Sequence, residues 1–244
     1  MRIAILSDIH GNFIAFDTVL ADVKRAGADQ LVCLGDVAFN GSQSVQVLKR
    51  LKEIGCPIVK GNADDFLLDP DSFTATNDRD KKIKDLGAWT LSQLSKTDLD
   101  FVRTFQPRFE IPLEDGKSLL CYRASPLSNE HIFWATTPDD ELVKMLGDYR
   151  ATVMAGGHTH MQMLRRFGES TLINPGSIGM PVVRDSQFQA TRHPDWAEYA
   201  MLTCERGNLS IEFRRVPLDV DAIVRDAHAS GMPHVDWWVE DWLK

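Results

Sequence analysis

The chain has 244 residues, of which 43% are hydrophobic and 25% are charged, and its net charge is −8. This length fits one large α/β domain, and it allows a core that needs neither disulfide bonds nor a structural metal to fold. The negative charge, with no Lys/Arg run longer than two residues, excludes a surface that attracts nucleic acid over long distance. We therefore expect no nucleic acid polymer as a partner.

The cysteines and the hydropathy pattern indicate the compartment. The four cysteines form no C-x-x-C pair, and Cys33, Cys121 and Cys204 lie in apolar, strand-like runs, as expected of buried thiols in a reducing compartment. The first apolar run has only four residues before Ser7, too few for a secretory leader, and no stretch is long enough to cross a bilayer. The sequence thus predicts a cytoplasmic protein without a membrane partner.

The first sixty residues follow a β-α-β-α-β pattern. Apolar residues at helical spacing predict helices at about 13–23 and 45–54, which end at Gly27 and Gly55. Short apolar runs predict three strands, at 3–6, 31–34 and 57–59.

A polar residue follows each of these strands: Asp8, Asp36 and Asn62. The three recur at intervals of 28 and 26 residues, about the length of one βαβ unit. Parallel strands joined by helices place their carboxyl ends on one edge of a sheet, where ligands usually bind. We therefore expect the three side chains to share that edge.

The rest of the chain is organised differently. Residues 63–108 are helical in character, with Pro107 as a stop, and we predict that they form a helical cap inserted into a single domain of residues 1–244. The turn pairs Asp115-Gly116 and Arg206-Gly207 predict hairpins, so we expect the second half to be largely antiparallel. Its strand-like runs are 109–113, 117–122, 152–155, 171–173, 198–204 and 208–216.

The C-terminal segment from Asp219 is helical in pattern and rich in tryptophan. Trp237, Trp238 and Trp242 are more typical of packing than of a ligand site. A contact in a homodimer is the alternative that we keep for them.

Two pairs of polar residues stand two positions apart at predicted strand ends: Asp8 with His10, and His158 with His160. This spacing points both members of a pair to the same side. Either pair alone occurs by chance in many proteins, but the combination with Gly35-Asp36 and Gly61-Asn62 is specific. A glycine before a ligand also permits a tight turn and a close approach of the backbone.

This mixture of ligands indicates the kind of ion. Carboxylate, amide and imidazole ligands favour Mn²⁺, Fe or Zn²⁺, whereas an all-oxygen site would favour Mg²⁺ or Ca²⁺. We expect one or two divalent transition metal ions, with Mn²⁺ preferred and Fe, Zn²⁺, Ni²⁺ or Co²⁺ as alternatives. A carboxylate can bridge two such ions, which lie roughly 3.5–4 Å apart in two-metal hydrolases.

The order D-x-H, G-D, G-N and G-H-x-H resembles the calcineurin-like metallophosphoesterase superfamily, and N-P-G-S-I-G-M-P at 174–181 resembles its compact bacterial branch. The resemblance implies an α/β (α+β) fold, a four-layer αββα sandwich of two mixed sheets. It also implies a metal-dependent enzyme that hydrolyses a small phosphodiester or phosphomonoester, with the diester slightly preferred, by metal-activated hydroxide. We expect 174–181 to support the site through backbone rather than side-chain contacts.

The resemblance assigns roles to individual residues. Asp36 and Asn62 would take part in catalysis, and Asn62 would also contact the substrate. Six residues would bind metal: Asp8, His10 and His160 the first ion, Asn62 and His158 the second, and Asp36 both.

Arg123 departs from the family pattern, because it stands in R-A-S-P where the family has a histidine ligand for the second metal. A guanidinium group has no lone pair and stays protonated, so it cannot ligate a cation and repels one. Three outcomes follow. The second metal binds weakly or not at all, Arg123 turns aside and water completes the shell, or Arg123 clamps the substrate phosphate. We predict a weakened second site, with Arg123 in the substrate pocket as a catalytic and substrate-binding residue.

Ala63 is a second departure, since many relatives have a histidine there that protonates the leaving oxygen. A general acid is worth roughly 10²–10⁴-fold, so without one we expect substrates with good leaving groups. The neighbouring Asp64 is expected to orient other groups. Arg184 and Asp185 either line the pocket or form a surface ion pair.

Two other functions remain open from the sequence. One is a dinucleoside polyphosphate or nucleotide pyrophosphatase. The other is a non-catalytic scaffold or ligand sensor on the same fold.

Overall fold

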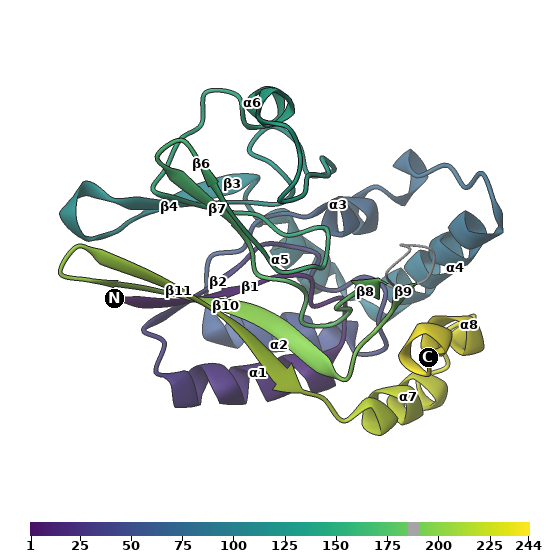
Figure 1. The fold of residues 1–244 in the computed structure, drawn as a ribbon. Helices are drawn as coiled ribbons and strands as arrows, with labels where there is room; N and C mark the ends of the chain where they lie inside the picture. The colour runs from purple at the N-terminus through teal and green to yellow at the C-terminus, as the bar shows by residue number, and fades with distance from the viewer. Residues whose placement is uncertain (185–190) are drawn as a thin grey trace.

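The computed structural model describes residues 1–184 and 191–244, which form two facing β-sheets with helices on the outer faces (Figure 1). The first sheet has the order β11-β10-β1-β2, and the second has the order β3-β4-β5-β7-β6. Both sheets contain parallel and antiparallel pairs. This arrangement confirms the predicted α/β sandwich of two mixed sheets.

The first sheet is built around two parallel strands, β1 and β2, which α1 and α2 follow. The side chain of Asn12 accepts a hydrogen bond from the backbone of Ala15 at the start of α1, and Gly27 ends that helix with φ 70°. Gly55 ends α2 in the same way. The bounds are β1 (Arg2–Leu6), α1 (Phe13–Ala26), β2 (Gln30–Cys33), α2 (Ser44–Ile54), β10 (Trp196–Glu205) and β11 (Asn208–Pro217).

The prediction of a third strand at 57–59 is wrong, because these residues form isolated bridges only. Ile58 forms one isolated bridge with Cys33, and Val59 forms another with Gln106. The run is too short for a ladder, because Pro57 precedes it and the chain enters a helix at Asn62. It still delivers Asn62 beside the ends of β1 and β2, as the pattern of strand ends predicts.

Residues 62–103 are mainly helical: α3 (Asn62–Leu68), α4 (Asp78–Gln93) and α5 (Lys96–Arg103), with a 3₁₀ turn at Pro70–Ser72. Phe66, Leu86 and Val102 join the same hydrophobic cluster as the buried faces of α1 and α2. The helical character predicted for 63–108 is therefore confirmed. Its description as an insertion into a single domain stays a prediction.

The strands of the second half pair mostly antiparallel, as expected, except at the centre of the second sheet. The hairpins predicted at Asp115-Gly116 and Arg206-Gly207 join β3 to β4 and β10 to β11. However, β4, β5 and β7 run parallel, because long connections return the chain to the same end of the sheet. The bounds are β3 (Arg108–Pro112), β4 (Ser118–Tyr122), α6 (Asp139–Leu146), β5 (Val153–Ala155), β6 (Met163–Phe167) and β7 (Ser170–Asn174), with a 3₁₀ turn at Glu114–Gly116.

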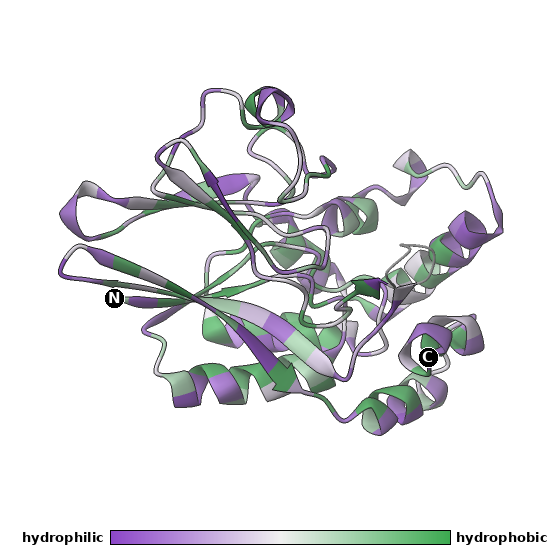
Figure 2. Cartoon of the chain, viewed as in Figure 1, coloured by the Kyte–Doolittle hydropathy of each residue, from purple (hydrophilic) through white to green (hydrophobic). Residues whose placement is uncertain are grey.

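Alternation along the strands determines which residues fill the space between the sheets. Ile3 and Ile5 of β1 pack with Leu119 and Cys121 of β4 in one cluster, whereas Ala4 and Leu6 face the helices. Hydrophobic residues, green in Figure 2, accordingly recur along both sheets and along α1 and α2, with hydrophilic residues between them. Cys33, Cys121 and Cys204 are buried as predicted, and the cysteines of the described residues are free.

The C-terminal segment packs beside α1 and the first sheet (Figure 1). Trp238 and Trp242 are buried in the large core cluster, and Trp238 Nε1 donates a hydrogen bond to the carbonyl oxygen of Asn40 at 2.7 Å. These contacts confirm the packing role, and the homodimer contact stays a prediction. The remaining elements are β8 (Val183–Arg184), β9 (Thr191–Arg192), α7 (Val220–Ala229), α8 (Val235–Val239) and a 3₁₀ turn at Glu240–Trp242.

None of the helices in the described ranges combines the length and the hydropathy that a membrane span requires. The predicted cytoplasmic location stays a prediction.

Candidate metal centre

An unusual backbone conformation marks the predicted ligands. Of the nine non-glycine residues with positive φ in the described ranges, five are predicted metal ligands. Such residues cost on the order of 1–3 kcal/mol each and cluster at functional sites, and Asp and His tolerate this region better than most residues. The five are Asp8 (57°), His10 (49°), Asp36 (52°), His158 (76°) and His160 (59°).

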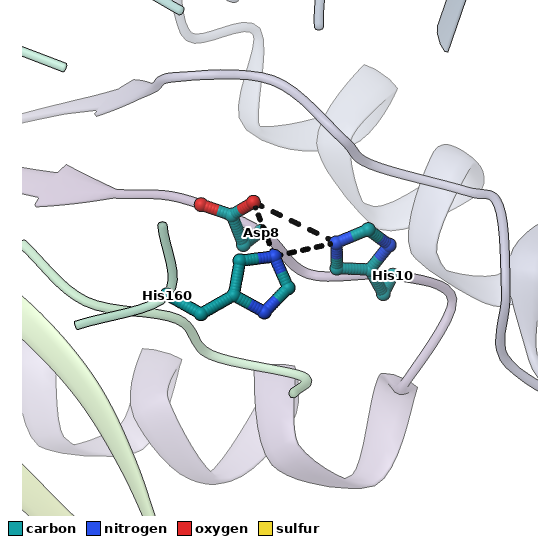
Figure 3. Close-up of side chains that lie close together, drawn as sticks. All are labelled: Asp8, His10 and His160. Carbon is teal, nitrogen blue, oxygen red and sulfur yellow. Dashed lines mark hydrogen bonds and ion pairs between the residues drawn. The ribbon is translucent and has the colours of Figure 1, made fainter. Parts of the chain in front are cut away.

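Three of these side chains converge on one point (Figure 3). His160 Nε2 lies 2.9 Å from Asp8 Oδ1, and His10 Nε2 lies 3.6 Å from the same oxygen. The two Nε2 atoms are 3.1 Å apart. Asp36 Oδ2 lies close to the same cluster, 3.7 Å from His10 Nε2. The cluster thus joins the loops after β1, β2 and β5.

The opposite nitrogen of each ring fixes its orientation. His10 Nδ1 lies 2.9 Å from the carbonyl oxygen of Phe39, and His160 Nδ1 lies 2.6 Å from that of Met180. A carbonyl oxygen only accepts, so Nδ1 carries the proton of a neutral ring and Nε2 carries a lone pair. Two lone pairs that face each other repel unless a cation lies beside them. The donor set therefore fits one divalent transition metal ion.

Asp8 is fully buried behind this cluster. Burial opposes ionisation of its carboxyl group, but the charge of Arg123 is the main effect that opposes burial, and the pKa of Asp8 is held well below its ordinary value. Ser7 Oγ donates to Asp8 Oδ2 at 2.5 Å, and the backbone N–H of His158 donates to the same oxygen at 3.2 Å. Ser7 carries no sequence signal that could have identified it.

Asp64 connects the loops that carry Asp36 and Asn62. Its carboxylate accepts backbone hydrogen bonds from Asp36, Val37 and Gly61 at 2.8–3.0 Å. Burial, together with the charge of Asp36, raises the pKa of Asp64 to about 6. A side chain at Gly61 would collide with Asp36 Oδ1, so glycine is required there. Asp64 thus has the orienting position that the sequence predicts.

The 174–181 segment supports the site through its backbone and its side chains. The backbone N–H of Gly179 and Ser177 Oγ both donate to the carbonyl oxygen of Asp8 at 2.9 Å. Asn174 Nδ2 donates to the carbonyl oxygen of Gly157 at 2.7 Å. The expectation of backbone rather than side-chain contacts is therefore wrong for Asn174 and Ser177, whose polar groups satisfy backbone atoms of the ligand loops.

Arg123 lies inside the ligand cluster, with only 1% of its surface exposed. Its Nη2 atom contacts Asp8 Oδ1 at 2.5 Å and also pairs with Asp36 Oδ2. Its Nε atom lies 3.4 Å from Asn62 Oδ1. Of the three outcomes considered for Arg123, the one in which its side chain turns aside is therefore wrong.

A cavity of about 440 Å³ opens above the cluster. One side holds five predicted ligands, and Arg123 is not among the lining residues, so its direct contact with a substrate stays a prediction. The rest of the lining combines a group of hydrophobic residues, here called the apolar wall, with the polar residues Asp65, Ser72, Asn129 and Glu130. The five ligands are His10, Asp36, Asn62, His158 and His160, and the apolar wall comprises Phe39, Phe66, Phe73 and Ile83.

Burial and the charge of Arg123 lower the pKa of His158, which keeps that ring neutral at neutral pH. Arg184 lies over the ring of Trp134, 5.0 Å from its centroid, and does not line the cavity. Asp185 lies outside the described residues.

The sequence is similar to those of known proteins. The model of the calcineurin-like phosphoesterase superfamily domain matches residues 1–207. Phosphodiesterase YfcE of Escherichia coli K12 is 26% identical over 191 residues, which cover 74% of this chain and 81% of YfcE. An uncharacterized protein of Methanocaldococcus jannaschii is 29% identical over 198 residues, which cover 73% of this chain and 76% of that protein.

Solved structures share the fold. The metallophosphoesterase from Sphaerobacter thermophilus superposes with a TM-score of 0.76 at 21% identity, covering 100% of this chain and 99% of the other. Because the family model spans most of the chain, the chain belongs to the calcineurin-like phosphoesterase superfamily, a superfamily of phosphoester hydrolases that use divalent metal ions.

Proposed function

We propose that this protein hydrolyses a small phosphate ester at the cavity above Asp8, His10 and His160, and that it prefers phosphodiesters to phosphomonoesters. One observation carries the proposal. Two imidazole nitrogens and a carboxylate oxygen converge, and the two imidazoles, those of His10 and His160, line a cavity that is large enough for a small ester. Family membership supports the same reaction class.

The positions of the residues indicate the role that we propose for each. When bound, a divalent ion, for which we propose Mn²⁺, supplies Lewis acidity and activates water. His10 and His160 would hold it through Nε2, and Asp8 and Asp36 would hold it through carboxylate oxygens. Asn62 lines the cavity beside them and orients the phosphoryl group through its amide.

His158 also lines the cavity, and its ring is neutral at neutral pH. A neutral imidazole can donate a hydrogen bond to a phosphoryl oxygen without adding a charge. We propose that His158 donates such a hydrogen bond to a phosphoryl oxygen of the substrate.

The apolar wall indicates the kind of ester. The rings of Phe39 and Phe66 lie 5.0 Å apart, and those of Phe66 and Phe73 lie 5.6 Å apart in an edge-to-face pair. Such a wall favours a flat, apolar group on the substrate. Ala63 offers no proton to a leaving oxygen, so a leaving group that needs none suits the site. We therefore propose a phosphodiester with an aromatic leaving group.

A panel of aryl diesters, aryl monoesters, nucleotides and dinucleoside polyphosphates tests this proposal, with Mn²⁺, Fe²⁺, Zn²⁺, Ni²⁺ and Co²⁺ added in turn. We expect the highest kcat/KM with bis(4-nitrophenyl) phosphate and Mn²⁺. Cleavage of dinucleoside polyphosphates alone would favour a pyrophosphatase instead. If no ester is hydrolysed with any metal, a scaffold or ligand sensor becomes the better description.

A further inference from the structure

We infer that the Arg123 guanidinium takes the place of a second cation, so that each chain holds one metal ion rather than two. The inference rests on the proposed function, because it concerns the same site. The residues around His10 and His160 fit a metal ion, as described above. Those around Asn62 and His158 do not fit a second one, because a permanent positive charge already contacts their carboxylate partner.

The contacts of Asp36 show most clearly that Arg123 takes the place of a second cation. Its Oδ2 atom lies 3.7 Å from His10 Nε2 on one side and pairs with Arg123 Nη2 on the other. A carboxylate in this position would bridge two cations, and here the second cation is the guanidinium. Asn62 Oδ1 also faces Arg123, 3.4 Å from its Nε atom. Two of the groups that a second ion would need therefore already interact with Arg123.

The surrounding structure fixes Arg123 in place. Its side chain follows β4 and is buried, and Nη1 lies 3.4 Å from both Ser7 Oγ and the carbonyl oxygen of Leu34. Its backbone carbonyl accepts a hydrogen bond from Gly157 at 2.6 Å, which ties it to the loop of His158. A side chain at Gly157 would crowd Nη1 and collide with Ser7 Oγ, so the guanidinium is closely packed on the side of Gly157.

Charge balance leads to the same conclusion. Asp8, Asp36 and Asp64 are all buried at this edge of the sheets. The Arg123 guanidinium stays protonated in proteins, and it contacts Asp8 and Asp36 directly. Without a second metal, Arg123 therefore offsets part of this negative charge, whereas an added divalent ion would meet a positive group at short range.

Metal stoichiometry tests the inference without reference to activity. The full chain is stripped with EDTA, equilibrated with excess Mn²⁺, passed through a desalting column and analysed by plasma mass spectrometry. We expect about one Mn²⁺ per chain and an electron paramagnetic resonance spectrum of isolated ions. Arg123→His should bind about two and show a spin-coupled spectrum. Arg166→His, which alters an exposed arginine on β6, is the matched control and should stay at one.

The possible outcomes separate the two proposals. Two tightly held ions in the unaltered chain overturn the inference but leave the proposed function intact. A folded Arg123→His protein that still binds one ion also overturns it. Binding of no metal contradicts the proposed function itself. If Arg123→His does not fold, the count and spectrum of the unaltered chain still decide the matter.

Discussion

The Nε2 atoms of His10 and His160 face each other at 3.1 Å, while Nδ1 of each ring contacts a backbone carbonyl oxygen. The carbonyl of Phe39 fixes one ring, and the carbonyl of Met180, which follows the Asn174–Ser177 turn, fixes the other. Both rings therefore present lone pairs to one point beside Asp8. This arrangement is preorganised for a cation and unfavourable without one.

Replacement of one ring tests that arrangement. We expect His160→Ala to weaken Mn²⁺ binding by more than about 100-fold, because loss of even an outer hydrogen-bonding partner costs roughly 10–100-fold in metal affinity. Isothermal titration calorimetry measures the affinity. His234→Ala is the control, since His234 pairs with Asp85 near the surface and should leave binding unchanged. Equal affinity of His160→Ala and the unaltered chain would contradict the assignment.

Asp64→Asn tests how the ligand loops are held. An amide keeps one acceptor oxygen but turns an NH₂ group toward at least one of the three backbone N–H donors. We expect a loss of about 1–3 kcal/mol in the free energy of unfolding and weaker Mn²⁺ binding. Urea denaturation measures the free energy of unfolding, and isothermal titration calorimetry measures the affinity for Mn²⁺. Asp65→Asn, at a half-exposed carboxylate paired with Lys60, should change both quantities much less, and equal effects of the two variants would argue against an orienting Asp64.

The apolar wall yields a kinetic prediction. Phe73→Ala removes one partner of an aromatic pair worth about 0.5–1.5 kcal/mol, so KM for bis(4-nitrophenyl) phosphate should rise about 2- to 10-fold. Methyl 4-nitrophenyl phosphate, which has one ring fewer, should be affected less. Phe109→Ala alters a partly buried phenylalanine between the sheets and is the control. An unchanged ratio of the two substrates would rule out this wall as a specificity element.

His193 yields a prediction on pH and stability. Burial of its ring, which packs on Trp242, lowers the pKa of His193 to about 4, whereas an unfolded chain has a value of about 6.5. Between pH 6.5 and 4 the unfolded chain binds a proton that the folded chain does not, so stability falls as the pH falls. The full loss is roughly 3 kcal/mol, complete below pH 4.

His193→Gln removes this titration and keeps a donor for the carbonyl oxygen of Pro181. Between pH 7 and pH 5, urea denaturation should therefore show a loss of stability about 2 kcal/mol smaller in the variant than in the unaltered chain. Parallel pH profiles of the two proteins would contradict the assigned cause.

The convergence of the predicted site residues could be foreseen because it follows from topology. Asp8 and Asp36 stand just past parallel strands, so any fold that pairs those strands brings them to one edge. The sequence does not predict the left-handed backbone at these residues, since a local pattern cannot show that tertiary contacts stabilise a strained φ. Nor could it place Arg123, because three outcomes are compatible with its charge, and only the distances to Asp8 and Asp36 exclude the one in which it turns aside.

Longer-range pairing also limits what the sequence reveals. The run at 57–59 has the composition of a strand, but its neighbours give it single bridges rather than a ladder. The sequence does not predict β6, because Arg165 and Arg166 interrupt its apolar alternation. In both cases the outcome depends on which partner strand is available, and residue type does not encode that choice.

The most direct test of a metal-dependent active site is an anomalous difference map from crystals soaked with Mn²⁺ and a phosphate analogue. We expect one strong peak within bonding distance of Asp8, Asp36 and the Nε2 atoms of His10 and His160, with the analogue beside it in the cavity. A map without a peak at that point, under saturating Mn²⁺, would contradict it.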